Sequence, residues 1–106
     1  MSNIKTINPS TNQVEKEYPV MDEQQIDAIL ETADKAFKSW RKTSFADRAQ
    51  LLNNVAAILR KRKDELGRLC SVEMGKLHKE AIGEVELSAA IFEYYAENGE
   101  KFLADA

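Results

Sequence analysis

The stretch from Asp22 to Trp40, DEQQIDAILETADKAFKSW, decides the fold class, because its apolar residues recur at helical intervals. The spacing of three and four residues places them on one stripe, formed by Ile26, Ile29, Leu30, Ala33, Phe37 and Trp40. Asp22 with Gln25 three residues later is typical of a capping box, and Met21 and Ile26 have the spacing of a hydrophobic staple. We therefore predict an amphipathic helix over residues 22–41.

The segment before this helix has the pattern of a short β-hairpin. Ile4, Ile7, Val14 and Tyr18 lie among polar residues, and the turn formers of residues 8–12, NPSTN, separate the two pairs. Asparagine tolerates the left-handed conformation, so we expect it at Asn12. The sequence predicts a hairpin over residues 3–18, which must pack on another element because an isolated two-stranded hairpin is marginally stable.

Further helices are predicted after residue 41, over residues 44–63, 64–74 and 77–98. Ser44 with Asp47 at the third helical position has the pattern of an N-cap, and Gly75 is placed where glycine often ends a helix. We expect Asn98-Gly99 to end the last helix. The apolar phase runs through Lys63 almost unchanged, so one long bent helix is the alternative to a break there.

The apolar residues at helical spacing are expected to form the buried side of each helix. In the second helix they are Leu51, Leu52, Val55, Ile58 and Leu59, and in the third Leu66, Leu69, Cys70, Val72 and Met74. In the last they are Ile82, Val85, Ala89, Phe92 and Tyr95, and we expect Phe37, Trp40 and Tyr94 in the core as well. The 4 Gly and 2 Pro of the chain are few for a protein with many turns. The expected fold is mainly α, with an N-terminal β-hairpin and three or four amphipathic helices in one domain of residues 1–106.

Composition and charge exclude several classes of protein. The chain of 106 residues has a formal net charge of −3, so no global basic field attracts nucleic acid or an anionic membrane. No apolar run approaches the ~20 residues that span a bilayer, and the polar start MSNIKTINPSTNQ does not have the pattern of a signal peptide. A single cysteine forms no internal disulfide, which suits a reducing compartment. We expect a cytoplasmic protein that binds neither nucleic acid nor membrane.

Cys70 and His78 are the only thiol and the only imidazole in the chain. A nucleophilic cysteine needs a helix N-terminus or a nearby cation to lower its pKa, whereas Cys70 falls late in a predicted helix and in phase with Leu66 and Leu69. Nothing in the spacing brings His78 within hydrogen-bonding distance, and no second cysteine or histidine completes a zinc site. We expect a buried Cys70, a surface His78 and no catalytic residue here.

The glycines and the charged runs do not predict a binding or catalytic site either. Gly67, Gly75, Gly83 and Gly99 are too widely spaced for a phosphate-binding loop. The basic run Arg60–Lys63 spreads around a helix beside two acids, so we expect a solvated helix end. The same holds for the acidic residues of the last helix, which are Glu84, Glu86, Glu93, Glu97 and Glu100.

Six short motifs, in order along the chain, resemble those of aldehyde dehydrogenases. They are Ile7-Asn8-Pro9-Ser10-Thr11 (INPATG-like), Ala36-Phe37-Lys38-Ser39-Trp40 (AFxxW), Asp47-Arg48 with Leu51-Leu52, Glu73-Met74-Gly75-Lys76 ([ED]xGK), Glu80-Ala81 with Glu84-Val85, and Tyr94-Tyr95-Ala96. The short lead before INP and the EMGK turn resemble the bacterial-type succinate-semialdehyde dehydrogenases. The resemblance implies that residues 1–106 form an N-terminal part of an α/β, Rossmann-like NAD(P)-binding domain.

The reaction implied by the resemblance is oxidation of an aldehyde to an acid, with hydride transfer to NAD or NADP. No catalytic or cofactor-binding residue of the family maps onto this sequence, since Cys70 in RLCS does not match the family's GQxC context. The family's base glutamate, PWN segment and cofactor-binding motif have no counterpart in these residues. We therefore expect the 106-residue chain to be inactive alone and to bind no cofactor alone.

One lesser site does map through the resemblance. Some relatives hold a structural alkali cation with backbone oxygens before NP and with the acid of the [ED]xGK turn, positions that Thr6, Ile7 and Glu73 match. A hydrogen bond at the helix end is the alternative role for Glu73. The expected partners are the remainder of an aldehyde dehydrogenase chain and further copies in a homo-oligomer. The alternative function is a free-standing helical module that acts by self-association.

Overall fold

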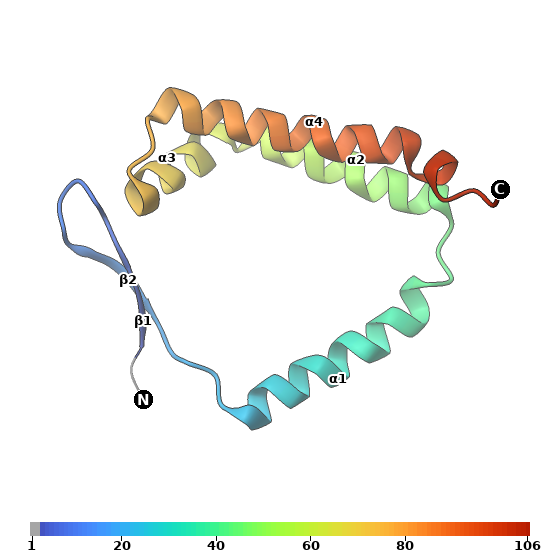
Figure 1. Ribbon diagram of the computed structural model, residues 1–106, viewed down its shortest axis with the longest axis horizontal. Helices are drawn as coiled ribbons and strands as arrows, with labels where there is room; N and C mark the ends of the chain where they lie inside the picture. The colour runs from blue at the N-terminus through green and yellow to red at the C-terminus, as the bar shows by residue number, and fades with distance from the viewer. Residues whose placement is uncertain (1–2) are drawn as a thin grey trace.

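A computed structural model of the protein describes residues 3–106. The elements in chain order are β1 (Ile4–Ile7), β2 (Val14–Tyr18), α1 (Glu23–Trp40), α2 (Phe45–Lys61), α3 (Lys63–Met74) and α4 (His78–Phe102). α2 and α4 lie side by side with α3 packed against the start of α4, the hairpin meets α3, and α1 stands away from this bundle (Figure 1). The predicted fold class, a β-hairpin followed by amphipathic helices, is confirmed.

The hairpin is antiparallel, with Ile4 opposite Tyr18 and Ile7 opposite Val14, and a bulge between Thr6 and Ile7. Asn12 adopts the left-handed conformation that the sequence predicts, with φ of 59°. Asn8 is buried and organises the turn, because its side chain accepts a hydrogen bond from the Ser10 amide (2.9 Å) and donates one to a carboxylate of β2. The turn lies near the end of α3, where a Cβ atom on Gly75 would be 3.4 Å from the Pro9 ring.

Helix α1 begins as its sequence predicts but packs differently. The Asp22 carboxylate accepts a hydrogen bond from the Gln25 amide (2.8 Å), and the Gln25 side chain accepts one from the Asp22 amide (3.0 Å), which completes a capping box. All residues of α1 are exposed, including its apolar stripe. The expected burial of Phe37 and Trp40 is therefore wrong for this chain, because no other described element covers α1.

The break between the second and third helices lies at Arg62, one residue before the predicted position. Arg62 leaves helical geometry with φ of −103° and ψ of 15°, so α2 and α3 are separate helices and the long bent helix is not formed. Ser44 caps α2 by accepting a hydrogen bond from the Asp47 amide (3.0 Å), and Gly75 ends α3 with a left-handed φ of 71°. Both caps are the ones that the sequence indicates.

The core is small and lies between α2, α3 and α4. Its fully or nearly buried apolar side chains are Ala56, Ala81, Val85 and Ala89. Small side chains allow the helix backbones to approach closely. Gly67 of α3 lies so close to α4 that a Cβ atom there would be 2.9 Å from Ile82 Cγ1. The bundle is therefore held by close contact of small residues rather than by large buried side chains.

Several predicted core residues are exposed instead. They are Leu51, Val55 and Ile58 of α2, Leu69 and Met74 of α3, and Tyr94 and Tyr95 of α4. Cys70 is half-buried rather than buried. Each apolar stripe is wider than the surface that its neighbour covers, so that only part of it is buried in this chain.

Helix α4 continues past the predicted stop at Asn98-Gly99 and ends at Phe102. A glycine inside a helix costs only about 1 kcal/mol relative to alanine, which other interactions offset. The Asn98 side chain donates a hydrogen bond to the Tyr94 carbonyl (2.9 Å), and the Tyr94 and Phe102 rings lie 5.9 Å apart. These contacts offset the low helix propensity of Gly99, so the helix continues.

The described structure is far more open than a folded domain of this size. The radius of gyration is 18.2 Å, against about 13 Å expected for a compact domain of this length. The accessible surface is 8757 Å², about 2,800 Å² more than the roughly 6,000 Å² expected for a monomer of 12.0 kDa. The hairpin, α1 and the α2–α4 bundle thus form a frame without a single closed core.

Candidate functional site

The structure does not bring Cys70 and His78 into a reactive pair. Cys70 lies half-buried on α3, and His78 is the exposed first residue of α4. Among the residues the structure describes, no hydrogen bond joins the two side chains, and no group of three His, Cys, Asp or Glu is placed to hold a metal ion.

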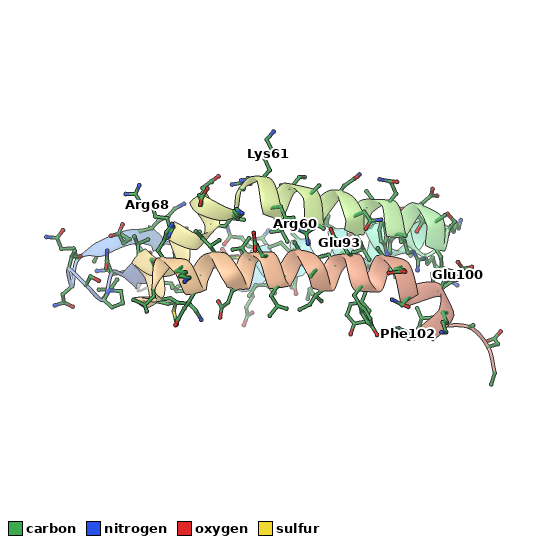
Figure 2. The ribbon with its side chains drawn as sticks, turned by 90° about the horizontal axis from the view of Figure 1, so that it is seen from above. Arg60, Lys61, Arg68, Glu93, Glu100 and Phe102 are labelled. Carbon is green, nitrogen blue, oxygen red and sulfur yellow. The ribbon has the colours of Figure 1, made fainter. Side chains whose placement is uncertain are left out.

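The basic run and the acidic helix are joined by ion pairs. Arg60 forms a two-pronged pair with Glu93, Lys63 donates to Glu86 (2.8 Å), and Lys76 pairs with Glu84, so α4 is tied to α2, α3 and the turn before it. Arg60 and Glu93 face each other between α2 and α4 in Figure 2, whereas Lys61 points away. The hydrogen bond from Lys63 lowers the pKa of Glu86, and the hydrogen bond to Glu84 raises the pKa of Lys76. These charges are part of the framework of the bundle.

The glycines do not form a dinucleotide site. Gly67 is buried against Ile82, Gly75 ends α3 against Pro9, and Gly83 and Gly99 lie inside α4 with open space where a Cβ atom would be. A phosphate cradle needs clustered glycines at the N-terminus of a helix. The four glycines of the chain therefore do not form such a cradle.

The candidate cation ligands Thr6, Ile7 and Glu73 lie on two segments that the structure brings together. The hairpin turn meets the end of α3, where a Cβ atom on Gly75 would lie 3.4 Å from the Pro9 ring. The Thr6 hydroxyl donates a long hydrogen bond (3.4 Å) to the Lys16 carbonyl. The cation site stays a prediction from the resemblance.

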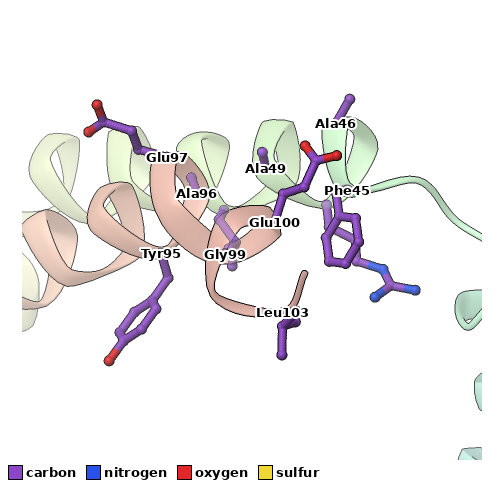
Figure 3. Close-up of a pocket in the computed structure, with 11 residues that line it drawn as sticks. Phe45, Ala46, Ala49, Tyr95, Ala96, Glu97, Gly99, Glu100 and Leu103 are labelled. Carbon is purple, nitrogen blue, oxygen red and sulfur yellow. The ribbon is translucent and has the colours of Figure 1, made fainter. Parts of the chain in front are cut away.

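A shallow pocket of about 290 Å³ lies between the start of α2 and the end of α4 (Figure 3). Its walls are mainly apolar, with Phe45, Leu52, Tyr95 and Leu103 among the lining residues, and Glu97 and Glu100 stand at its rim. The residues that line this pocket include no cysteine and no histidine. The pocket can accept an apolar group but offers no reactive centre.

Two helices, α1 and α4, carry several exposed large apolar side chains each. The first part, which we name the α1 face, consists of Ile26, Ile29, Leu30, Phe37 and Trp40. The second part, the α4 face, consists of Leu87, Ile91, Tyr94, Tyr95 and Phe102, on a different side of α4 from the buried Val85 and Ala89. A helix that is apolar on two sides is typical of one buried from both sides.

A corner between α1 and α2 fixes the direction of the α1 face. Arg48 donates hydrogen bonds to the Thr43 hydroxyl (2.8 Å) and the Trp40 carbonyl (3.1 Å). Its guanidinium lies 5.5 Å from the centre of the Trp40 ring and 5.8 Å from that of Phe45, within the range of cation–π attraction. One side chain thus holds the end of α1 to the start of α2.

The chain matches the sequence model of the aldehyde dehydrogenase family over residues 1–105. This chain belongs to the aldehyde dehydrogenase family. It is 41% identical over 98 residues to a succinate-semialdehyde dehydrogenase [NADP(+)] of Deinococcus radiodurans, and 39% identical over 102 residues to a probable one of Synechocystis. The matches cover 92% and 96% of this chain but only 20% and 22% of those relatives. The chain of this aldehyde dehydrogenase family member therefore spans about a fifth of the length of the curated relatives it matches.

Solved aldehyde dehydrogenase structures have the same open arrangement. A succinic semialdehyde dehydrogenase from Streptococcus pyogenes, solved with NADP+, superposes with a TM-score of 0.88 at 40% identity, over 94% of this chain and 22% of that one. A structure of Gox0499 reaches a TM-score of 0.93 at 31% identity, over 98% of this chain and 23% of that one. The separation of α1 from the bundle is thus also present in chains more than four times longer.

Sequence reasoning found the family motifs but missed what two of their residues do. Arg48 was recognised only as part of a motif, and only the fold shows that its guanidinium lies near the rings of both Trp40 and Phe45. Asn8 was assigned to a turn without any sign that it would be buried. No residue that sequence reasoning raised as a catalytic candidate lies in a reactive arrangement in the described chain.

Proposed function

We propose that this chain is the N-terminal segment of an NADP-dependent succinate-semialdehyde dehydrogenase, which oxidises the aldehyde to succinate. The observation that carries the proposal is the agreement of sequence and shape with relatives of that name. The Deinococcus radiodurans and Synechocystis relatives have that name and are about 40% identical to this chain. The Streptococcus pyogenes structure was solved with NADP+. The proposed cofactor of the whole enzyme is therefore NADP rather than NAD.

We also propose that the 106-residue chain has no activity of its own. Cys70 lies half-buried at the late end of α3 with no base joined to it, and the four glycines form no phosphate cradle. In this proposal the segment contributes the hairpin and the helices of an NAD(P)-binding domain. Purified chain mixed with NADP+ and succinate semialdehyde should give no rise in absorbance at 340 nm.

The experiment that tests the proposal links these 106 residues covalently to the part of a relative that lies outside the matched segment. The chain is joined to the remaining four fifths of the Deinococcus radiodurans relative, and reduction of NADP+ and of NAD+ is followed with succinate semialdehyde and with a longer apolar aldehyde. We expect turnover that prefers succinate semialdehyde and NADP+. An active joined protein with the opposite preference would contradict the proposed substrate or cofactor, and turnover by the chain alone would contradict its inactivity.

A second candidate function is self-association, which the exposed α1 and α4 faces favour. Large contiguous apolar patches are rare on monomers. In that case the chain acts as a helical interaction module, and light scattering should show a stable oligomer without any partner. A stable monomer at high concentration would contradict this second function.

We propose that the full protein is a cytoplasmic homo-oligomer that binds no nucleic acid and no membrane. The single cysteine supports a reducing compartment, and three of the four cations in the basic run are engaged by glutamates. None of the helices described between residues 3 and 106 combines the length and apolarity needed to cross a bilayer. A shift in mobility with duplex DNA or RNA that is lost at high salt would contradict the proposed absence of nucleic-acid binding.

A further inference from the structure

We propose that Asn98 is a site of spontaneous deamidation, and that the reaction shortens α4 from a long form that ends at Phe102 to a short form that ends before Gly99. Asn98-Gly99 is the one Asn-Gly pair in the sequence, and it lies near the end of α4. A glycine after asparagine leaves the backbone nitrogen open to the side-chain amide, because glycine has no Cβ atom. The inference is independent of the proposed dehydrogenase activity.

The reaction needs only these two residues and water. The Gly99 backbone nitrogen attacks the side-chain carbonyl carbon of Asn98 and forms a C–N bond, while the proton of the Gly99 amide passes to the side-chain nitrogen, which leaves as ammonia. Water then breaks one of the two C–N bonds between the carbonyl carbons and the ring nitrogen of the resulting succinimide. The product is aspartate, or isoaspartate when water attacks the backbone carbonyl. Either product carries a carboxyl group that asparagine lacks.

The long form of α4 keeps the reacting atoms apart. The Asn98 side-chain amide donates a hydrogen bond to the Tyr94 carbonyl (2.9 Å), so the side chain is directed toward the preceding turn and away from Gly99. Each backbone N–H inside an α-helix donates to the carbonyl four residues earlier, which engages the Gly99 nitrogen, and the helical ψ of Asn98 does not allow the ring to close. Deamidation therefore proceeds only while the last turn of α4 is open.

Few contacts hold the last turn of α4 closed. The Leu103 amide donates to the Gly99 carbonyl (3.1 Å), and the Phe102 ring lies 5.9 Å from the Tyr94 ring. A Cβ atom on Gly99 would meet nothing within 4 Å, so no neighbouring element packs on this position. Glycine and asparagine also often follow the last residue of a helix, and helix ends open at little cost in free energy. The two ends of α4 are therefore close in free energy.

Deamidation prevents the last turn from closing again. A carboxylate at position 98 cannot donate to the Tyr94 carbonyl and instead faces its oxygen. The new charge also adjoins Glu97 at the end of the helix, where the helix dipole disfavours negative charge. Isoaspartate in addition lengthens the backbone, which breaks the helical hydrogen-bond pattern. Gly99 and Leu103 line the pocket between α2 and α4, so the short form withdraws part of its wall (Figure 3).

The rate of deamidation tests whether the helix protects Asn98. Mass spectrometry follows conversion of Asn98 in the purified chain, in neutral buffer and in concentrated urea. We expect conversion at least about tenfold slower in buffer, because the folded chain reacts only through local opening. Phe102→Ala removes the ring contact with Tyr94 and should raise the rate in buffer, whereas Leu87→Ala, the control in the middle of α4, should not. Equal rates in buffer and urea, no conversion in urea, or equal rates in the two variants would overturn the inference.

A variant with the charge of the product tests whether the reaction shortens α4. In Asn98→Asp, hydrogen exchange of the Leu103 amide, which reports its bond to Gly99, should be at least about tenfold faster than in the unchanged chain. Asn98→Ala loses the same bond to Tyr94 without adding a charge and should exchange close to the unchanged rate, since alanine favours the helix. Exchange as slow in Asn98→Asp as in Asn98→Ala would overturn the shortening of α4.

Discussion

The guanidinium of Arg48 lies 5.5 Å from the centre of the Trp40 ring and donates a 3.1 Å hydrogen bond to the Trp40 carbonyl. This relationship joins the last residue of α1 to the first turn of α2. Because α1 packs on no other described element, the angle between α1 and the bundle depends on this corner. The orientation of the α1 face is therefore controlled by a residue outside that face.

Replacing Arg48 should loosen the corner without unfolding the bundle. Arg48→Lys keeps the charge but loses the planar fork that reaches Thr43 and Trp40 together. We expect a broader distribution of distances between spin labels at Gln24 of α1 and Ala90 of α4, measured with Cys70→Ser as background. Arg68→Lys on α3 is the matched control and should leave the distribution unchanged. A distribution equally narrow in both variants would show that Arg48 does not set the angle.

The N-cap of α1 should matter more for helix content than the N-cap of α2. Asp22→Ala removes the carboxylate that accepts from the Gln25 amide, one of the two hydrogen bonds of the capping box, a loss of about 1 kcal/mol. Helices without tertiary support are marginal in water, so we expect faster hydrogen exchange across residues 23–40 and a weaker signal at 222 nm. Ser44→Ala removes the cap of α2, which packs on α4, and should lower the unfolding midpoint while preserving helix content. The reverse pattern would mean that α1 is supported by packing after all.

Two glycine-to-alanine changes should have opposite effects. At Gly67 the new Cβ atom would lie 2.9 Å from Ile82 Cγ1 and 3.3 Å from the Ile82 amide nitrogen, so the Ile82 side chain or the helix backbones must shift. We expect a net loss of about 1–2 kcal/mol, since overpacking outweighs the gain in helix propensity. At Gly83 nothing lies within 4 Å, so alanine there should stabilise α4 by up to about 1 kcal/mol. Urea midpoints measure both, and a stabilising Gly67→Ala would contradict the close contact.

The pair of Lys63 and Glu86 should stabilise the bundle only while both groups are charged. The hydrogen bond from Lys63 lowers the pKa of Glu86, so the contribution of Glu86 is present above its ordinary pKa of about 4.3 and is lost as pH falls through the lowered folded pKa. The hydrogen bond to Glu86 raises the pKa of Lys63, so its contribution is present below about pH 10.4 and is lost as pH rises through the raised folded pKa.

Lys63→Met should therefore lower the melting temperature at pH 7, and the difference from the unchanged chain should shrink progressively below about pH 4. Salt at 1 M should reduce the difference at pH 7 by screening. Lys61→Met, whose side chain points away from α4, is the control (Figure 2). A difference that is the same at pH 7 and pH 3 would show that Lys63 acts through packing rather than charge.

Local signals predicted the elements well because their causes are local. The capping residues Asp22 and Ser44 and the left-handed Asn12 and Gly75 act through hydrogen bonds or dihedral preferences within a few residues. The failures are of another kind. The prediction that the last helix ends at Asn98-Gly99 was wrong, because Tyr94 contacts both Asn98 and Phe102. Burial of Leu51 and Tyr95 was expected from periodicity, which reports that a surface is apolar but not what covers it.

The sequence by itself determined the helices, their caps and the family, because helical periodicity and short motifs depend only on residues close together in the sequence. Only the tertiary structure decided which part of each apolar stripe is buried here and which is left exposed. That choice depends on Gly67 and the alanines of α4, which allow α2, α3 and α4 to meet closely, and on Arg48, which joins the end of α1 to the start of α2. Contacts between segments distant in sequence have no local signature, so the exposed α1 and α4 faces became visible only in the folded chain.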